Sequence, residues 1–294
     1  FEVTDGAGNT ATCSFDVTVE DNEDPAITCP GDINAGVDTG NCSAVVSYTA
    51  PVGTDNATGS TTTQTAGLPS GSAFPLGTTT NTFEVTDASG NTSTCSFDVV
   101  ISDDEAPTAS NPATANVECS ADIPVVDILV VTDESDNCTG SPTVAFVSES
   151  TDGGSNPETI TRTYSVTDAA GNSITVTHTI VVNDVSDPVI TSCPTNITQD
   201  TDASASTAVV TYTVPAFTDN CGATINQTAG QASGTAFPIG TTTNTFEVTD
   251  GAGNTATCSF DVTVEDNEDP EITCPGDINA GVDTGNCSAV VSYT

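Results

Sequence analysis

Apolar and polar residues alternate strictly through several short stretches of the chain. In residues 12–19 every second residue is apolar, starting at Cys13 and ending at Val19, and residues 42–48 repeat the pattern. Because successive side chains of a strand point to opposite faces, this two-residue period predicts half-buried β-strands. Glycine- and Asx-rich segments such as residues 4–9 separate the strands and favour turns. No stretch shows a sustained helical period, so the chain is predicted to be all-β.

The chain is built from repeats on two length scales. Residues 1–49 recur at 246–294, and 48 of the 49 positions are identical. A shorter period appears inside this unit: the Phe-Glu-Val-Thr-Asp motif at Phe1 returns at Phe83 and, as a variant, at Tyr164. Three modules therefore make one period of 245 residues. Such near-identity predicts further copies of the same repeat as partners along a longer chain.

Module boundaries are marked by acidic segments that end in proline. We place them at 1–24 for the end of a preceding module, 25–106 for module 1, 107–187 for module 2, 188–269 for module 3 and 270–294 for the start of the next module. About 80 residues, many short strands and regular turns predict tandem immunoglobulin-like β-sandwiches of about seven strands, arranged end to end as a rod.

The amino-acid composition limits the possible partners and the location of the protein. The chain carries 41 acidic residues and a single Lys or Arg, Arg162, for a net charge of −40. Phosphate binding needs clustered cations, so nucleic acid is excluded as a natural partner. No apolar run is long enough for direct membrane insertion. The charge implies a saline environment or bound cations. Eleven cysteines without zinc-type spacing predict disulfides and a secreted, extracellular location.

An enzyme is not expected. Nucleophilic catalysis needs a base beside a serine or cysteine, and the only histidine is His178, within the alternating run 175–180. Val176 and Ile180 share its parity, so His178 is predicted to be a partly buried structural residue.

Five motifs carry a family resemblance. They are Ile-Thr-Cys-Pro at 27–30, Cys-Ser-Ala-Val-Val at 42–46, Asp-Asn-Cys at 219–221, Ala-Phe-Pro-Ile-Gly at 236–240 and Cys-Ser-Phe at 258–260. In this order and spacing the chain resembles an array of HYR (hyalin repeat) modules. The resemblance implies an immunoglobulin-like fold with an extracellular adhesive or structural role at the cell surface. The near-identical repeats and the absence of lysine look more similar to long bacterial surface adhesins than to animal matrix proteins.

The resemblance also implies a disulfide pattern, with four cysteine positions per module. The pairs it implies are Cys42–Cys95, Cys119–Cys138 and Cys193–Cys221. Two interpretations of the remaining Cys29 and Cys258 stay open. Either they form bridges across module junctions, Cys13–Cys29 and Cys258–Cys274, or they are buried free thiols that act as small apolar side chains.

Acidic and amide side chains recur at the module junctions. In a seven-strand sandwich of this kind, the B–C and F–G loops lie at the N-terminal end, beside the incoming linker. Oxygen ligands converging from three segments suit Ca²⁺; alternatively, these residues are simply turn formers and a solvated spacer. The candidate ligands are Glu20, Asp21, Glu23, Asp24, Asp55, Asn56 and Asp87; Asp103, Asp104, Glu105, Asp136, Asn137 and Asp168; Asp184, Asp187, Asp219, Asn220 and Asp250; and Asp266, Glu268 and Asp269.

Two functions are compatible with these features. The first is a structural spacer or shaft of a repetitive filament or cell-surface adhesin, stiffened by disulfides and Ca²⁺, whose distal region binds surface glycans or proteins. The second is an adhesive module whose repeat loops themselves recognise glycan or protein ligands. Aromatic residues make up only 5% of the chain, so stacking platforms for sugars are scarce and the spacer is favoured.

Overall fold

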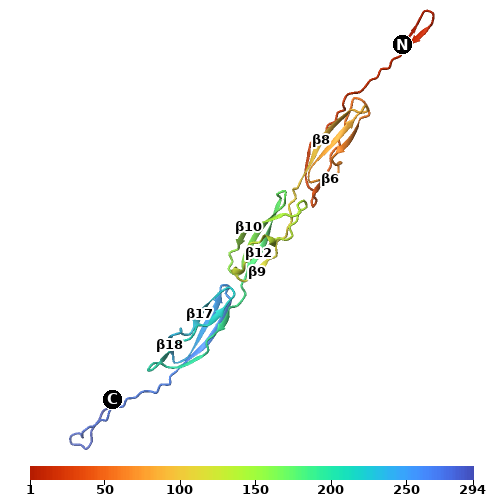
Figure 1. Cartoon of the computed structure of the whole chain (residues 1–294). Helices are drawn as coiled ribbons and strands as arrows, with labels where there is room; N and C mark the ends of the chain where they lie inside the picture. The colour runs from red at the N-terminus through yellow and green to blue at the C-terminus, as the bar shows by residue number, and fades with distance from the viewer. The chain divides into compact units, whose positions relative to one another are not determined.

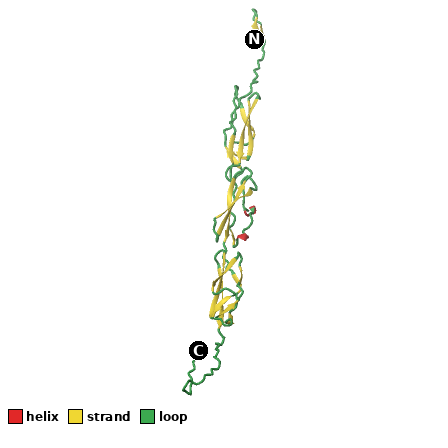
Figure 2. Ribbon diagram, turned by 90° about the vertical axis from the view of Figure 1, so that its left-hand side faces the viewer, coloured by secondary structure: helices red, strands yellow, loops and turns green.

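The computed structural model describes all 294 residues and confirms the all-β prediction. Its only helical segments are two single 3-10 turns, η1 (Ser120–Asp122) and η2 (Ile128–Val130) (Figure 2). The chain divides into two compact units, and the division runs through module 2. The first unit holds Phe1–Ala115, Val125–Thr151 and Ile160–Thr179; the second holds Asn116–Pro124, Asp152–Thr159 and Ile180–Thr294.

Module 1 lies in the first unit and is a β-sandwich. One sheet has the order β3-β8-β7-β5, with β3 pairing parallel to β8; these strands are β3 (Ile33–Gly36), β5 (Thr61–Ala66), β7 (Gly77–Thr86) and β8 (Thr92–Ser102). The other sheet pairs β4 (Ser43–Val46) with β6 (Ser72–Pro75). Figure 1 labels β6 and β8, one strand from each sheet.

Both sheets of module 1 contribute to one core. Phe74 of β6, Phe83 of β7 and Phe97 of β8 are buried in the same cluster. The ring of Tyr48 packs edge-on against Phe97, with centroids 5.0 Å apart. Inward side chains on β7 and β8 follow the two-residue period of the sequence, so the alternation alone determines which face of the sheet is buried.

Module 3 repeats this arrangement in the second unit. Its sheet order is β14-β20-β19-β17, beside the pairs β15-β18 and β13-β16. The strands are β13 (Val189–Ser192), β14 (Ile197–Asp200), β15 (Thr207–Val210), β16 (Ala216–Thr218), β17 (Ala223–Ala229), β18 (Thr235–Pro238), β19 (Gly240–Asp250) and β20 (Thr255–Glu265). Tyr212 packs edge-on against Phe260, with centroids 4.9 Å apart.

Module 2 has a sheet with the order β10-β11-β12-β9. Its strands are β9 (Ala115–Val117), β10 (Thr143–Thr151), β11 (Glu158–Thr167) and β12 (Ser173–Val182). Arg162 is 5% exposed, and its Nε donates to Oε2 of Glu149 at 2.6 Å. His178 is 6% exposed, which confirms that it is buried. Burial, followed by the charge of Arg162, lowers the pKa of His178.

Identical sequences adopt different structures at the two ends of the chain. Residues 255–265 form β20 between β19 and β14. The same eleven letters at 10–20 form only β2 (Thr10–Thr12), which pairs with β1 (Glu2–Thr4). Phe260 is 3% exposed, whereas its counterpart Phe15 is 68% exposed. The predicted strand at 12–19 is therefore wrong at this copy, because partner strands are needed to complete it.

The predicted disulfides are wrong. None of Cys42–Cys95, Cys119–Cys138, Cys193–Cys221, Cys13–Cys29 and Cys258–Cys274 forms. The structure contains Cys29–Cys95 and Cys193–Cys258 inside modules 1 and 3, and Cys42–Cys138 and Cys119–Cys221 between successive modules. Cys29 and Cys258 are thus bridged within their own modules and are not free thiols. Cys13, Cys274 and Cys287 are the free cysteines of this chain.

The correction has a geometric reason. Cys42 follows a turn whose Gly40 N–H donates to the Glu105 carboxylate in the outgoing linker, so this turn lies at the exit of module 1. Position 57, the counterpart of Cys138 and Cys221, lies beside Asp55, which clusters with Asp21 of the incoming linker. The second and third cysteine positions therefore lie at opposite ends of a module and meet partners in neighbouring modules.

Candidate metal centres at the module junctions

Three groups of three aspartates lie at the junctions. Cluster 1 is Asp21, Asp55 and Asp87; cluster 2 is Asp103, Asp136 and Asp168; cluster 3 is Asp184, Asp219 and Asp250. In each, one carboxylate comes from the linker, one from the loop predicted as B–C and one from the hairpin turn predicted as F–G. In each cluster, one carboxylate oxygen from each of the three residues lies within 4.8 Å of the other two. The structure thus brings together one residue from each of the three segments identified in the sequence.

The hairpin aspartates are held by their own turns. Oδ1 of Asp87 accepts hydrogen bonds from the backbone N–H groups of Ser89 and Asn91 at 2.9 and 2.8 Å, and Oδ2 accepts one from Nδ2 of Asn91 at 2.8 Å. Burial acts to raise the pKa of Asp87, but these hydrogen bonds outweigh it and the pKa is lowered. The same balance lowers the pKa of Asp168 and Asp250. These three side chains are therefore preorganised as carboxylates.

The asparagine four residues later ties each turn to the linker. Nδ2 of Asn91 also donates to the backbone carbonyls of Asp21 and Glu23, both at 3.2 Å. Asn172 does the same to the carbonyl of Asp103 at 3.2 Å. These asparagines were not among the predicted ligands, although the recurring Asp-x-x-x-Asn spacing is a signal for them in the sequence.

Two of the three loop aspartates, Asp136 and Asp219, use one oxygen for the backbone and leave the other unpaired. Oδ2 of Asp136 accepts from the N–H of Cys138 at 2.9 Å, and Oδ2 of Asp219 accepts from the N–H of Cys221 at 3.0 Å. The other oxygen, Oδ1, is buried without a hydrogen-bond partner in both residues. A buried carboxylate oxygen without a partner is costly, since it has lost its water and gained nothing.

The linker aspartates complete the clusters. Oδ1 of Asp21 accepts from the N–H of Glu23 at 3.2 Å, while Oδ2 is buried and unpaired. In cluster 2, burial raises the pKa of Asp103, and the nearby charges of Asp136 and Asp168 add to the effect. Both observations indicate a concentration of negative charge that a cation would relieve.

The other twelve predicted ligands lie outside the three clusters. Six of them form hydrogen bonds at the junctions or module exits: Nδ2 of Asn56 donates to Glu23, Glu105 accepts from Gly40, Nδ2 of Asn137 donates to the carbonyl of Asn41 at 2.8 Å, and Asn220 and Glu268 form the contacts described below. The remaining six are Glu20, Asp24, Asp104, Asp187, Asp266 and Asp269. Nδ2 of Asn220 donates to Oε2 of Glu118 at 2.7 Å, and Glu118 was not selected from the sequence.

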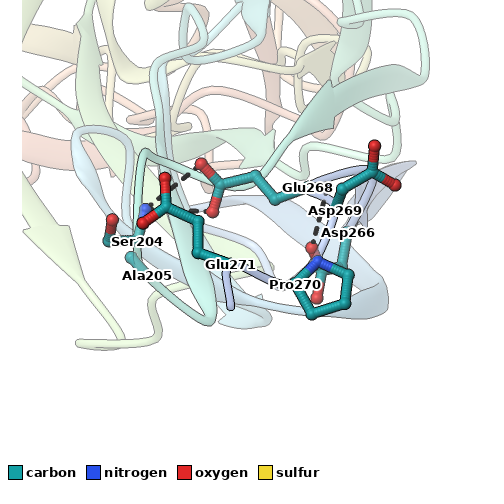
Figure 3. Close-up of a pocket in the computed structure, with 7 residues that line it drawn as sticks. All are labelled: Ser204, Ala205, Asp266, Glu268, Asp269, Pro270 and Glu271. Carbon is teal, nitrogen blue, oxygen red and sulfur yellow. Dashed lines mark hydrogen bonds between the residues drawn. The ribbon is translucent and has the colours of Figure 1, made fainter. Parts of the chain in front are cut away.

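The outgoing linker of module 3 shows the same junction contact as module 1. Glu268 Oε2 accepts from the backbone N–H of Ser204 at 3.0 Å, and the N–H of Glu268 donates to Asp266 Oδ1 at 3.2 Å (Figure 3). Ser204 has a φ of 59°, in the left-handed region that Gly40 occupies at the equivalent position. A turn that exposes one N–H to a linker glutamate is therefore a shared feature of the exits of modules 1 and 3.

The donor set fits calcium. Every candidate ligand is an oxygen from a carboxylate, and no cysteine or histidine belongs to the clusters. Hard oxygen donors of this kind suit Ca²⁺ more than softer transition metals. The buried unpaired oxygens of Asp21, Asp136 and Asp219 provide one anchor point in each cluster.

No helix of this structure has the length and apolar character needed to cross a bilayer. The four disulfides fit a secreted, extracellular protein, because such bonds persist in oxidising compartments.

Sequence and structure comparisons place the chain among known proteins. The chain is 34% identical over 300 residues to hyalin of Strongylocentrotus purpuratus, covering 98% of this chain and 25% of that protein. It is 30% identical over 301 residues to hyalin of Lytechinus variegatus, covering 99% of this chain and 57% of that protein. The chain thus spans about a quarter of the length of the first relative and somewhat over half of the length of the second.

Among solved structures, the protocadherin gammaB4 extracellular domain matches 90% of this chain and 55% of its own, at 16% identity and a TM-score of 0.35. Mouse cadherin-23 EC22-24 matches 83% of this chain and 100% of its own, at 14% identity and a TM-score of 0.31. The family described as "HYR domain" matches residues 20–101 and 183–264, and the "HYR-like domain with 4 cysteines" matches 107–182. The chain therefore belongs to the HYR domain family.

Proposed function

We propose that this chain is a structural spacer of an extracellular adhesion protein, in which Ca²⁺ and disulfides fix each module to the next. The membership in the HYR family and the disulfides support an extracellular adhesive or structural role. The resemblance to long bacterial surface adhesins remains a prediction, as do binding of surface glycans or proteins by a distal region and the array of further repeats.

The observation that carries the calcium proposal is the charge balance inside the clusters. In each cluster three carboxylates bring one oxygen apiece within 4.8 Å of one another, and one oxygen per cluster is buried without a partner. The sequence holds only one lysine or arginine, Arg162, and it pairs with Glu149 inside module 2. No side-chain cation of this protein is available to compensate the clusters. Like charges at this distance repel strongly in a partly buried setting.

Bound Ca²⁺ would neutralise this repulsion and give the unpaired oxygens a partner. The residues that would hold it in cluster 2 are Asp103, Asp136 and Asp168. The chain's own hydrogen bonds already orient two of these carboxylates: the hairpin turn holds Asp168, and the backbone of Cys138 holds Asp136. A cation joining linker, loop and hairpin would resist bending at the junction, because all three segments would have to separate together.

An adhesive role for the repeat loops is the second candidate. Module 2 exposes several apolar side chains, with Val125 84%, Leu129 74% and Val147 55% exposed. This surface favours contact with another protein over a sugar, since large exposed aromatics are few. A catalytic role is disfavoured, because His178 and Arg162 are buried in module 2.

Titration calorimetry with Ca²⁺ tests the proposal on the whole chain. We expect binding at the three clusters, a higher melting temperature in Ca²⁺ than in EGTA, and little response to Mg²⁺. Asp136→Asn should remove one site, whereas Asp122→Asn, an exposed aspartate outside the clusters, should remove none. Absence of binding heat together with a melting temperature unchanged by EGTA would refute the calcium role.

A further inference from the structure

Two of the four disulfides tie one module to the next. Cys42 of module 1 bonds Cys138 of module 2, with Cα atoms 4.8 Å apart. Cys119 of module 2 bonds Cys221 of module 3, with Cα atoms 5.2 Å apart. Each bond joins a residue at a module's exit to the Asp-Asn-Cys loop of the following module. Each also lies within one compact unit of the structure.

Module 3 contains a turn that matches the one before Cys42, but it has no cysteine at the position that bonds to the next module. The turn before Cys42 is closed by Asp38, whose N–H donates to the carbonyl of Ser43 at 2.8 Å. In module 3 the N–H of Asp202 donates to the carbonyl of Thr207, also at 2.8 Å. The residue that corresponds to Cys42 in this matching turn is Ser206, which has no thiol.

Module 1 contains a loop that matches those of Cys138 and Cys221, but it has no cysteine at the position that bonds to the preceding module. The N–H of Ala57 donates to Oδ2 of Asp55 at 2.7 Å, the same bond that Cys138 and Cys221 make in their loops. Ala57 therefore occupies the place of the bridging cysteine in an unchanged loop. No bridge of this kind can form at the entry of module 1.

The two missing cysteines, at the positions of Ser206 and Ala57, belong to the same type of junction. Module 3 is followed by a copy of the start of module 1, since residues 246–294 repeat 1–49. An exit without a cysteine thus meets an entry of the type that has none. One cysteine lost alone would leave an unpaired thiol at every period, and the joint loss avoids this. The absence of a bridge at this junction is therefore a matched feature of the repeat.

The bridges act on the same loops as the acidic clusters. Cys138 follows the cluster residue Asp136 by two positions, and Cys221 follows Asp219 by two. At the second bridge, Nδ2 of Asn220 lies 3.2 Å from Sγ of Cys221 and donates to Glu118, the neighbour of Cys119. A bond that fixes the loop to the preceding module also keeps its aspartate beside the linker.

We infer that the bridges divide the junctions into two classes. At clusters 2 and 3 the modules stay joined when the cation is removed. At cluster 1 no bridge is present, and only the cation and the hydrogen bonds of Asn91 and Asn56 fix the linker to the loops, so each period of 245 residues contains one junction that loss of calcium releases. This inference rests on the proposed calcium role. It assigns to the protein three-module blocks joined by calcium-dependent joints.

The test converts a bridged junction into an unbridged one. Cys42→Ser with Cys138→Ala copies Ser206 and Ala57, the residues that the protein itself uses at these positions. All proteins would carry Cys13→Ser, Cys274→Ser and Cys287→Ser, so that free thiols cannot exchange with the bridges. A protease that cuts after glutamate reports opening at Glu105, whose side chain is engaged by Gly40 in the closed junction.

In saturating Ca²⁺, cleavage after Glu105 should be equally slow with and without the bridge. In EGTA we expect the variant to be cut at least about tenfold faster and the bridged protein less than about twofold faster, because cleavage follows the population of the open form. Removing the other bridge instead, by Cys119→Ser with Cys221→Ala, should leave cleavage after Glu105 as slow as in the bridged protein.

The outcomes separate the two proposals. If EGTA accelerates cleavage equally with and without the Cys42–Cys138 bridge, the bridge does not keep the junction closed and the inference is overturned, while the calcium role stands. If EGTA changes cleavage in neither protein, the calcium role itself is contradicted and the two classes of junction fall with it.

Discussion

Gly67 and Asn81 lie so close that a Cβ atom on Gly67 would clash with Oδ1 of Asn81. The same oxygen accepts hydrogen bonds from the N–H of Leu68 at 2.8 Å and from Nε2 of Gln64 at 3.0 Å. Asn81 is completely buried. This network closes the connection after β5 around a polar group in the interior. Module 3 builds the same contact between Gly230 and Asn244.

Gly67→Ala should therefore destabilise module 1 by about 2–3 kcal/mol, from the clash together with a φ of +86°. Gly77→Ala is the matched control. Gly77 has a φ of +97° but no atom within 4 Å of its would-be Cβ, so only the backbone term of about 1 kcal/mol remains. Urea denaturation of both variants measures the difference. Equal losses would show that the contact with Asn81 contributes nothing.

His178 makes the stability of module 2 depend on pH. Burial and the charge of Arg162 lower its pKa below the ordinary 6.5, so the unfolded chain binds the proton more readily than the folded one. Stability is therefore fully present above about pH 6.5 and is lost as the pH falls below it. His178→Phe, which copies Phe97 of module 1, should remove this part of the dependence. Melting curves between about pH 7.5 and about pH 5 compare the two proteins, and parallel curves would contradict the assignment.

Local patterns predicted the fold and the clusters well. The alternation around Phe83 and Phe97 determines the buried face of module 1, because strand periodicity is a local property. The clusters were predictable for a related reason: Asp21, Asp55 and Asp87 lie in segments that a sandwich brings to one end. Topology alone was sufficient to group them.

Contacts between modules could not be predicted in the same way. Cys42 and Cys138 are 96 residues apart, and the bridges predicted across a junction joined other cysteines, Cys13 to Cys29 and Cys258 to Cys274. The usable signal was the pair of missing cysteines at Ala57 and Ser206, which mark complementary positions. The two copies of one eleven-residue sequence, at 10–20 and 255–265, make the same point. A strand depends on its neighbours as much as on its own residues.

Asp103 provides a test of the cation that does not rely on binding heat. Burial and the charges of Asp136 and Asp168 raise its pKa, so its ionised form destabilises the folded chain without a cation. That cost is absent below its ordinary pKa of 3.8, grows as the pH rises from there to the raised value, and is fully present above it. Asp103→Asn should therefore raise the melting temperature in EGTA and lower it in Ca²⁺. A shift of the same sign in both buffers would contradict a cation at cluster 2.

The disulfide assignment predicts which cysteines resist alkylation. An alkylating reagent applied to the unreduced, unfolded chain should leave the eight bridged cysteines unmodified. After reduction all eleven should react. Non-reduced digests cut at acidic residues should yield linked peptides that join Cys42 to Cys138 and Cys119 to Cys221, since only the folded junctions bring these residues together. A peptide joining Cys42 to Cys95 would instead confine the bridges to single modules and remove the covalent ties between them.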